Sequence, residues 1–375
     1  MKYIFCQILF LIAGHSCFGQ KTDVANYIIE VIKIPNNGKA ILVPISISNK
    51  KYLFLFDTGA ARSAFDIRLP VKDASLTTEL AVGTSGSKEL RTGKPGDGYL
   101  GRMNIKDSIN NVWLDNMSNL RNSLGKEVYG VLGLDFIVNK IIQIDFDNGE
   151  LRFLDKIKEP PGDVYDLSIN KIGQVEISAK LNDSILDKFV VDTGFISTQS
   201  GFLKEDTSSA LKINTKFHMV GDGIFQGIAG ENTQSFTQFD TIKFGDKLIK
   251  KPIFTINNTS ILSNYFLSRF LVTIDYSQKK IYLKPGKNYT KKDLYNLSGM
   301  HLLVDDKKII IDGLDEGSVS KKSGILIGDQ IFKLETIELA KLDVEDLRIL
   351  LSTPGDLKLT IQRKSKMIDF VLRLK

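Results

Sequence analysis

The sequence predicts a mostly β protein, in which two similar β-rich halves are followed by a small domain of mixed α and β structure. Three observations lead to this fold class. A set of short sequence blocks occurs twice in the same order, runs of Ile, Val, Phe and Thr bounded by Gly, Asn and Asp fill both copies, and the composition changes after Pro285. With 375 residues the chain is long enough for two or three domains, each with its own core.

The internal repeat consists of three matched blocks, each separated from its counterpart by 130 or 135 positions. The pairs are residues 54–59 and 189–194, residues 131–136 and 261–266, and residues 142–146 and 272–276. Three matches in one order are hard to attribute to composition, so they indicate a duplicated domain. The first half is expected over residues 27–156 and the second over residues 162–286.

Each half is expected to close with paired strands. Residues 145–153 read as a β-hairpin around an Asn148-Gly149 turn, and residues 275–283 read as the equivalent hairpin of the second half. Long helical periodicity is scarce in both halves, which also favours β structure.

Residues 1–19 have the pattern of a secretory signal peptide, with Lys2 followed by a short apolar run and small residues. The alternative is a buried first helix. The prediction is an exported protein, periplasmic or secreted, without an integral membrane span, because the run is too short for a permanent anchor. Cys6 and Cys17 both lie in this segment, so no disulfide is expected in the mature chain. Lipoprotein anchoring at Cys17 is the less favoured alternative.

The remaining composition excludes several classes of protein. A formal charge of +6 with interleaved basic and acidic residues is too small a surplus for a nucleic-acid-binding footprint. The three histidines, His15, His218 and His301, are too scattered for a zinc cluster or a Ser-His-Asp triad. We therefore expect no metal and no cofactor.

Asp57 and Asp192 are the candidate catalytic residues, because each follows an apolar strand at the same place in the repeat. Two carboxyl groups about 3 Å apart cannot both ionise cheaply, so one acts as a base toward water and the other as an acid toward the leaving amine. Such a pair titrates as one coupled system. Asp135 and Asp145 also lie near the repeat blocks, but structural roles in turns or caps are expected for them.

The residues that follow each Asp suit this chemistry. Gly59 and Gly194 allow a tight backbone turn beside the carboxyl groups. Thr58 and Thr193 can donate hydroxyl hydrogen bonds across the pair and so hold the two loops in register.

The apolar strand followed by Asp-Thr-Gly resembles the signature of the pepsin and retropepsin aspartic peptidases, and it occurs in both halves. In that family a later apolar pair followed by Gly passes behind each Asp loop, and residues 131–133 look like it. In the second half Ser263 takes the place of that Gly. The resemblance implies a bilobal double β-barrel and an aspartic endopeptidase. Because one chain supplies both lobes, a monomer would be sufficient for the active site.

The residue after each Gly differs from the hydroxyl residue that is frequent in pepsin-like enzymes. It is Ala60 in the first half and Phe195 in the second. A missing hydrogen bond to the ionised carboxylate raises its pKa, so a pH optimum nearer neutral than that of pepsin is expected. Two glycine clusters, residues 82–87 and 220–225, are candidates for flaps over the cleft, the alternative being plain turns.

The C-terminal segment, residues 296–375, matches neither half. Its expected elements are strands at residues 308–311 and 358–362 and a helix around residues 343–351. Residues 317–331 resemble the Gly-x-x-x-Gly-Asp-x-Ile frame of bacterial PDZ domains, which implies an α+β peptide-binding domain. In the resemblance, the residues that offer backbone N–H groups to a peptide C-terminal carboxylate are Gly299, Met300, His301 and Leu302. The alternative is a domain that only covers or stabilises the second half.

Together these features predict an exported aspartic endopeptidase with peptide or protein substrates, which the PDZ-like domain docks. The alternative is a catalytically inactive bilobal protein that binds peptides or acts as a scaffold. This second hypothesis is motivated by Phe195 and Ser263.

Overall fold

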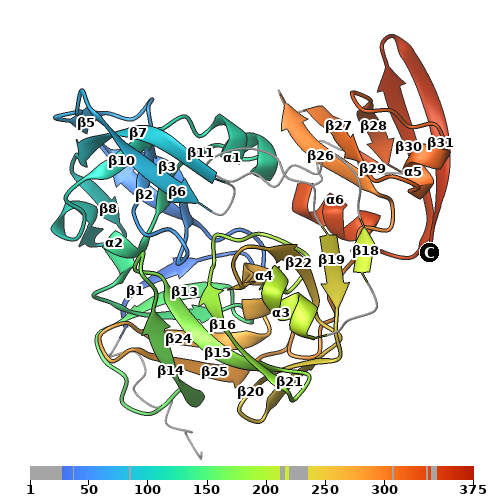
Figure 1. Ribbon diagram of the computed structural model, residues 1–375. Coiled ribbons are helices and arrows are strands. Elements are labelled where there is room, and N and C mark those ends of the chain that lie inside the picture. Colours follow the sequence, from blue (N-terminus) through green and yellow to red (C-terminus); the bar gives the residue numbers. More distant parts are fainter. Residues whose placement is uncertain are drawn as a thin grey trace, which may run out of the picture.

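The computed structural model describes residues 28–36, 38–83, 86–211, 216–218, 235–305, 308–334, 337–338 and 344–375. Three predictions from the sequence lie outside this part of the chain: the signal segment, the lipidation alternative at Cys17 and the second flap candidate. Within it the protein is mostly β, as expected, with three sheets and a few short helices (Figure 1).

A ten-stranded sheet belongs to the first half and carries the strand that precedes Asp57. Its strands are β2 (Leu42–Ile47), β3 (Lys50–Phe56), β4 (Ala64–Asp66), β5 (Val71–Lys72), β6 (Thr78–Gly83), β7 (Gly86–Pro95), β8 (Gly98–Leu100), β9 (Met103–Asn104), β10 (Val112–Asp115) and β11 (Val128–Leu132). Their order is β5-β7-β10-β4-β11-β3-β2-β8-β9, with β6 paired to β7. Three short helices accompany this half: η2 (Ile105–Asp107), α1 (Ser118–Leu124) and α2 (Leu134–Ile137).

A fifteen-stranded sheet contains strands of both halves. Its members are β1 (Ile28–Lys33), β12 (Ile141–Asp145), β13 (Glu150–Leu154), β14 (Asp163–Ile169), β15 (Val175–Leu181), β16 (Ile185–Val191), β17 (Gly201–Lys204), β18 (Lys216–His218), β19 (Ser235–Gln238), β20 (Thr241–Phe244), β21 (Lys247–Lys250), β22 (Ile253–Asn257), β23 (Ile261–Leu262), β24 (Phe270–Asp275) and β25 (Lys280–Pro285). The helices α3 (Glu205–Ala210) and α4 (Asn264–Leu267) lie in the second half.

The two halves meet through equivalent strands. β12 pairs antiparallel with β24, and Gln143 lies opposite Thr273, its own counterpart in the repeat. The Gln143 side chain donates from Nε2 to Thr273 Oγ1 at 3.0 Å in the buried middle of the sheet. One large apolar core continues through both halves around this junction.

Both predicted closing hairpins are present. β12 pairs with β13 and β24 pairs with β25, and each hairpin has a four-residue connection rather than Asn-Gly alone. Asp145 Oδ1 accepts a hydrogen bond from Asn148 N at 3.0 Å, which is the turn role expected for it. The last residue of the connection has positive φ in both hairpins, +63° at Gly149 and +51° at Lys279. The same turn geometry is thus kept with different residues.

The predicted double β-barrel differs from the observed sheets. All three strand orders are open, and the described strand pairings close no barrel. The ten-stranded order ends on β5 and β9, two-residue strands that pair only with β7 and β8. These end strands are too short to carry a ladder around the sheet.

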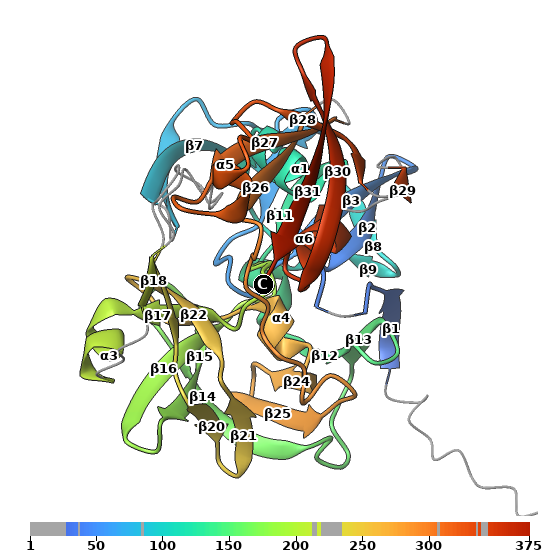
Figure 2. The ribbon, with the colours of Figure 1, turned by 90° about the vertical axis from the view of Figure 1, so that its right-hand side faces the viewer.

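The C-terminal segment forms a six-stranded sheet with a core of its own. Its elements are β26 (Met300–Asp305), β27 (Lys308–Leu314), α5 (Val319–Lys322), β28 (Gln330–Leu334), β29 (Ile337–Glu338), α6 (Val344–Leu351), β30 (Gly355–Arg363) and β31 (Lys366–Leu374). They include the two strands and the helix expected there. The sheet lies beside the first half and above α4 of the second half (Figure 1 and Figure 2).

Candidate active site

Asp57 and Asp192 lie at equivalent ends of two equivalent strands. β3 leads to Asp57 and runs parallel to β11, while β16 leads to Asp192 and runs parallel to β23. The backbone N–H of Asp57 donates to Leu132 O at 3.0 Å, and that of Asp192 donates to Leu262 O at 3.2 Å. The apolar blocks found in the repeat therefore support the two Asp loops from behind.

The structure brings the two carboxyl groups together, each against the loop of the other, with Asp192 beside Gly59 and Asp57 beside Gly194. Each Oδ1 also accepts two backbone N–H bonds from its own loop. Asp57 takes them from Gly59 and Ala60 at 2.7 and 2.9 Å, and Asp192 takes them from Gly194 and Phe195 at 2.8 and 2.9 Å. The second oxygen of each carboxyl group makes none of these four bonds. The two Oδ1 atoms are thereby held in place by backbone N–H groups of their own loops.

Both glycines of the two loops are required by the close approach of the opposite carboxyl group. A Cβ atom on Gly59 would lie 2.7 Å from Asp192 Oδ1, and one on Gly194 would lie 2.5 Å from Asp57 Oδ1. Neither distance is compatible with a side chain, so these positions need glycine for space rather than for backbone conformation.

Thr58 and Thr193 are completely buried and link the two loops reciprocally. Each backbone N–H donates to the hydroxyl oxygen of the other Thr at 3.0 Å. Each hydroxyl then donates across the junction, from Thr58 to Val191 O at 2.7 Å and from Thr193 to Phe56 O at 2.8 Å. The hydrogen bonds across the pair that the sequence predicted are present, and they hold the two carboxyl groups in fixed relative positions.

Burial between the two halves raises the pKa of both carboxyl groups. For Asp57 the loss of solvation exceeds the opposing effect of the backbone N–H bonds. For Asp192 the pKa is raised well above its ordinary value, by burial first and then by the negative charge of Asp57. Two carboxyl groups in this environment share one proton over a range of pH in which isolated carboxyl groups are ionised.

The two departures from the family pattern have structural explanations. Phe195 contributes its backbone N–H to Asp192, while its ring packs on Phe202 with 4.3 Å between ring centroids. Ser263 is buried, accepts from Phe266 N at 3.1 Å and donates to Gln199 O, so its hydroxyl caps α4. Neither residue displaces the Asp192 loop.

Asp135 lies close behind the first Asp loop and serves that loop rather than the cleft. It accepts from Ser63 N at 2.9 Å and from the Ser63 hydroxyl at 2.5 Å. Ser63 in turn accepts from Gly133 N at 2.9 Å. Burial raises the pKa of Asp135. Its structural role was expected from the sequence, although this partner was not.

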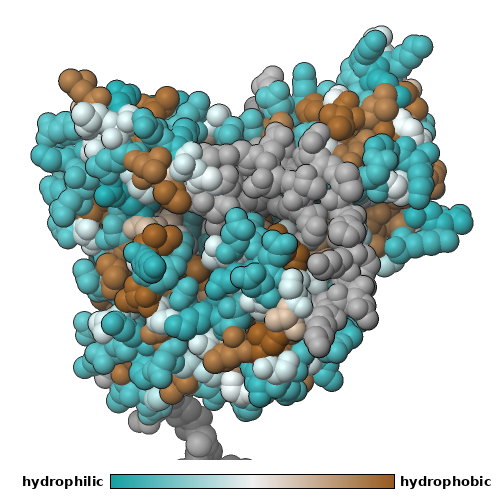
Figure 3. Space-filling view, viewed as in Figure 1, coloured by the Kyte–Doolittle hydropathy of each residue, from teal (hydrophilic) through white to brown (hydrophobic). Residues whose placement is uncertain are grey.

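A cleft of about 650 Å³ contains both carboxyl groups. The hairpin of β6 and β7, which is the first flap candidate, contributes Val82, Lys88 and Leu90 to its wall. The Val82 side chain is 59% exposed. Figure 3 gives the surface in the same orientation, with the first half at the upper left and the six-stranded sheet at the upper right. The tip of this hairpin, residues 84–85, lies outside the described residues.

The sequence did not predict that the C-terminal sheet forms part of this cleft. β26 and α6 line the same cavity as the carboxyl groups, among others through Leu303 and Ile349. Glu345 of α6 is buried against the first half, where its Oε1 accepts from Ala40 N at 3.0 Å. Arg348 donates to Ser123 O at the end of α1 at 3.0 Å. Such docking between parts of a fold has no local sequence signal.

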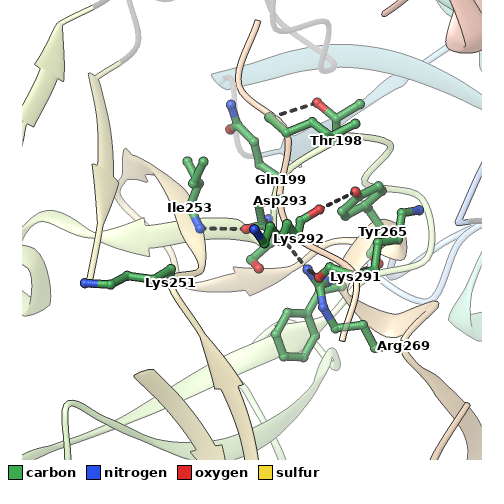
Figure 4. Close-up of polar contacts among 12 residues, drawn as sticks. Thr198, Gln199, Lys251, Ile253, Tyr265, Arg269, Lys291, Lys292 and Asp293 are labelled. Carbon is green, nitrogen blue, oxygen red and sulfur yellow. Dashed lines mark hydrogen bonds and ion pairs between the residues drawn. The ribbon is translucent and has the colours of Figure 1, made fainter. Parts of the chain in front are cut away.

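The connector between the second half and the C-terminal sheet, residues 286–299, is anchored to the second half by buried polar contacts (Figure 4). Asp293 accepts from Ile253 N at 2.6 Å and pairs with Arg269 at 2.5 Å, and both charged side chains are almost completely buried. The Tyr265 hydroxyl donates to Lys292 O at 2.7 Å. The connector therefore behaves as part of the second half and not as a linker.

The loop predicted to bind a peptide carboxylate uses several of its donors internally. Gly299 N donates to Asn296 Oδ1 at 3.1 Å, and Met300 N donates to Ser298 Oγ at 3.0 Å. His301 Nε2 lies 2.7 Å from Asp315 Oδ1. Met300, His301 and Leu302 all line the cleft.

Comparison with known proteins assigns the chain to no family. No family model matches the chain, and no curated protein matches it either. Over the described residues, the helices are all too short or too polar to cross a membrane, and no group of three or more His, Cys, Asp or Glu side chains could hold a metal ion.

Proposed function

We propose that the protein is an exported aspartic endopeptidase of the pepsin and retropepsin type, with Asp57 and Asp192 as its catalytic pair. The observation that carries this proposal is the pair itself: two adjacent carboxyl groups with raised pKa values, held by equivalent, cross-linked loops inside one cleft. Each half supplies only one carboxyl group of the pair. A catalytic site in which two carboxyl groups share one proton therefore explains why both halves keep the Asp-Thr-Gly loop.

The proposed chemistry uses both carboxyl groups on one bound water molecule. The ionised Asp removes a proton from the water as it attacks the peptide carbonyl carbon, while the protonated Asp donates its proton to the carbonyl oxygen. The Asp that took the proton from water then donates it to the leaving amine as the C–N bond breaks. The other Asp takes back a proton from the hydroxyl of the tetrahedral intermediate, which restores the shared-proton pair. The reciprocal Thr hydrogen bonds support this role, because they fix the relative position of the two groups to the precision that proton transfer needs. The raised pKa values favour activity nearer neutral pH than for pepsin.

A non-catalytic peptide-binding or scaffold protein is the second candidate. The observation in its favour is that Phe195 and Phe202, which pack together beside Asp192, place two aromatic side chains in the lining of the cleft. In this case the Asp pair would be retained for its structural contacts alone.

Cleavage of an unstructured peptide mixture, followed by mass spectrometry from about pH 3 to about pH 8, separates the two candidates. We expect pepstatin-sensitive hydrolysis that falls at least about a thousandfold in Asp57→Asn and in Asp192→Asn. Asp240→Asn, at an exposed carboxylate, is the matched control and should keep full activity. Absence of turnover throughout this pH range would favour the scaffold.

A further inference from the structure

The residues that flank the carboxyl pair differ in size between the two halves. Ala60 follows Asp-Thr-Gly in the first half, and Phe195 follows it in the second. Each donates its backbone N–H to the Asp of its own loop at 2.9 Å, so the two residues are equivalent in structure as well as in sequence. Both line the cleft. A methyl group on one side of the pair therefore corresponds to an aromatic ring on the other.

The strand register identifies a second pair of this kind. Ala64 of β4 lies opposite Val131 of β11, and Phe202 of β17 lies opposite Ile261 of β23. Val131 and Ile261 are counterparts in the repeat, since each opens a matched block. Ala64 and Phe202 therefore occupy equivalent places, and both line the cleft.

The difference in size changes how far each side is filled. The three first-half residues are half-buried, whereas their counterparts are almost fully buried, with exposed fractions of 8% for Phe195, 1% for Phe202 and 2% for Ile261. The two rings pack on each other and form one small apolar cluster with Ile261 and Val190. The space beside the alanines of the first half is thus occupied, in the second, by the protein's own side chains.

The open place in the first half is lined by apolar side chains. Leu55 of β3, Leu120 of α1 and Val131 belong to one apolar cluster, and all three line the cleft. Ile196 of the second half joins the same cluster from across the junction. We call this set the first-half pocket: Leu55, Ala60, Ala64, Leu120 and Val131. None of its side chains is charged, so it suits an apolar group.

A polypeptide that lies across the carboxyl pair meets both places. The two Asp loops lie against each other's carboxyl groups and are joined by reciprocal Thr hydrogen bonds, so they stand in equivalent positions on the two sides. A large side chain can enter the first-half pocket without displacing protein atoms. The same side chain at the second half would have to displace the packed rings of Phe195 and Phe202, and overpacking of this kind is unfavourable.

We propose that Phe195 and Phe202 determine an asymmetric cleavage preference. On one side of the cleaved bond the substrate presents a large apolar side chain, such as Leu or Phe, to the first-half pocket. At the mirror position it presents a small residue, such as Gly, Ala or Ser, to the second half. The inference rests on the proposed peptidase function for the identity of the ligand as a substrate, but the difference between the two sides can be measured by binding alone.

Cleavage of a peptide library by the full chain tests this preference. The cleaved bonds, mapped by mass spectrometry, should show large apolar residues enriched on one side and small residues at the mirror position on the other. A peptide with large apolar residues on both sides should have a kcat/KM at least about tenfold below that of a mixed peptide, which is large on one side and small on the other. Equal enrichment of large apolar residues on both sides would overturn the proposal.

Exchanging the sizes of the equivalent residues gives a sharper test. Phe202→Ala should raise kcat/KM for the peptide with large residues on both sides about tenfold, and Ala64→Phe should lower it for the mixed peptide about tenfold. Phe332→Ala makes the first change at a residue of the C-terminal sheet that is 53% exposed, and it should have no effect. Phe195→Leu serves if Phe202→Ala does not fold, with a smaller gain expected. An unchanged preference in the folded variant would refute the inference.

Binding to the full chain carrying Asp57→Asn measures the same asymmetry without turnover. The probes are fluorescein-labelled peptides with two blocks of about four residues, which span about 26 Å when extended. One has Leu and Phe in both blocks, and two have Leu and Phe in one block and Ala in the other, in either order. Fluorescence anisotropy should show one mixed peptide binding about tenfold more tightly than the peptide with two large blocks, and adding Phe202→Ala should bring the two dissociation constants within about twofold. Equal or tighter binding of the peptide with two large blocks to the Asp57→Asn chain contradicts the proposal.

Turnover of the same peptides by the chain with both Asp residues intact separates this proposal from the previous one. If a mixed peptide binds more tightly in a Phe202-dependent manner but none of the peptides is cleaved, the asymmetry stands and the peptidase function fails. If all are cleaved equally well and Phe202→Ala changes nothing, the peptidase stands and the asymmetry fails.

Discussion

The reciprocal hydrogen bonds of Thr58 and Thr193 allow a sharp test of how the two halves are joined. Thr193→Val keeps the size of the side chain and removes its hydroxyl. Phe56 O then loses the donor at 2.8 Å, and Thr58 N loses the acceptor at 3.0 Å. Both Thr side chains are completely buried, so water cannot replace these partners without opening the junction.

The size of the effect follows from these two lost bonds. Each contributes about 1 kcal/mol net, and a buried group left without a partner costs about 1 to 3 kcal/mol. Thr193→Val should therefore lower the free energy of unfolding by about 2 to 4 kcal/mol. Thr58→Val should cost a similar amount, because its two bonds, to Val191 O and from Thr193 N, have the same geometry.

Urea unfolding followed by the fluorescence of Trp113, the single Trp of the sequence, measures this loss. Thr193→Ser is the matched control, since it keeps the hydroxyl and loses one methyl group, at a cost of about 1 kcal/mol. If Thr193→Val costs no more than Thr193→Ser, or if the two Val variants differ by more than about 2 kcal/mol, the reciprocal link does not join the halves as described.

Three further predictions concern the site and the connector. Asp192→Asn should raise the free energy of unfolding near about pH 7 and have little effect near about pH 3. Folding raises the pKa of this carboxyl group, so the native state loses stability as the pH rises above the ordinary pKa of an Asp. Urea unfolding of both proteins at the two pH values checks this, and an equal effect at both contradicts it. Gly59→Ala should lower peptide cleavage at least about a hundredfold by pushing the opposite carboxyl group aside, whereas Gly96→Ala, where a Cβ meets only Pro70 O at 3.9 Å, should leave cleavage unchanged. Asp293→Asn should destabilise the chain by about 3 to 5 kcal/mol by leaving buried Arg269 without its anion, as measured by circular dichroism during urea unfolding; a loss below about 1 kcal/mol would contradict this account of the connector.

The local features of the fold could be predicted from the sequence because the repeat gives each of them twice. The mostly β class, the closing hairpins and the approach of Asp57 to Asp192 follow from matched strands and turns. The exchange of hydrogen bonds by Thr58 and Thr193 follows as well, because a hydroxyl beside each carboxyl group has few other partners in a symmetric junction.

The arrangement of the parts could not be predicted in this way. Glu345 and Ala40 are 305 positions apart, and neither position has a pattern that indicates a partner. Asp293 lies in a stretch that reads as a polar linker, and its burial depends on Arg269, which reads as an ordinary surface charge. The state of the Gly299 loop depends on the Asn296 side chain, which the family resemblance does not include.

The pairing of Gln143 with Thr273 has a consequence for the origin of the chain. Equivalent residues face each other there, so the contact is isologous, and the halves are related by an approximate two-fold axis. A single half can satisfy such a contact with a second copy of itself, as a homodimer does. Gene duplication and fusion then turn a symmetric pair into one chain whose halves are free to diverge. The exchanges of Gly133 for Ser263 and of Gly149 for Lys279 record that divergence, and a gene for residues 28–156 alone is the natural starting point for rebuilding the symmetric ancestor.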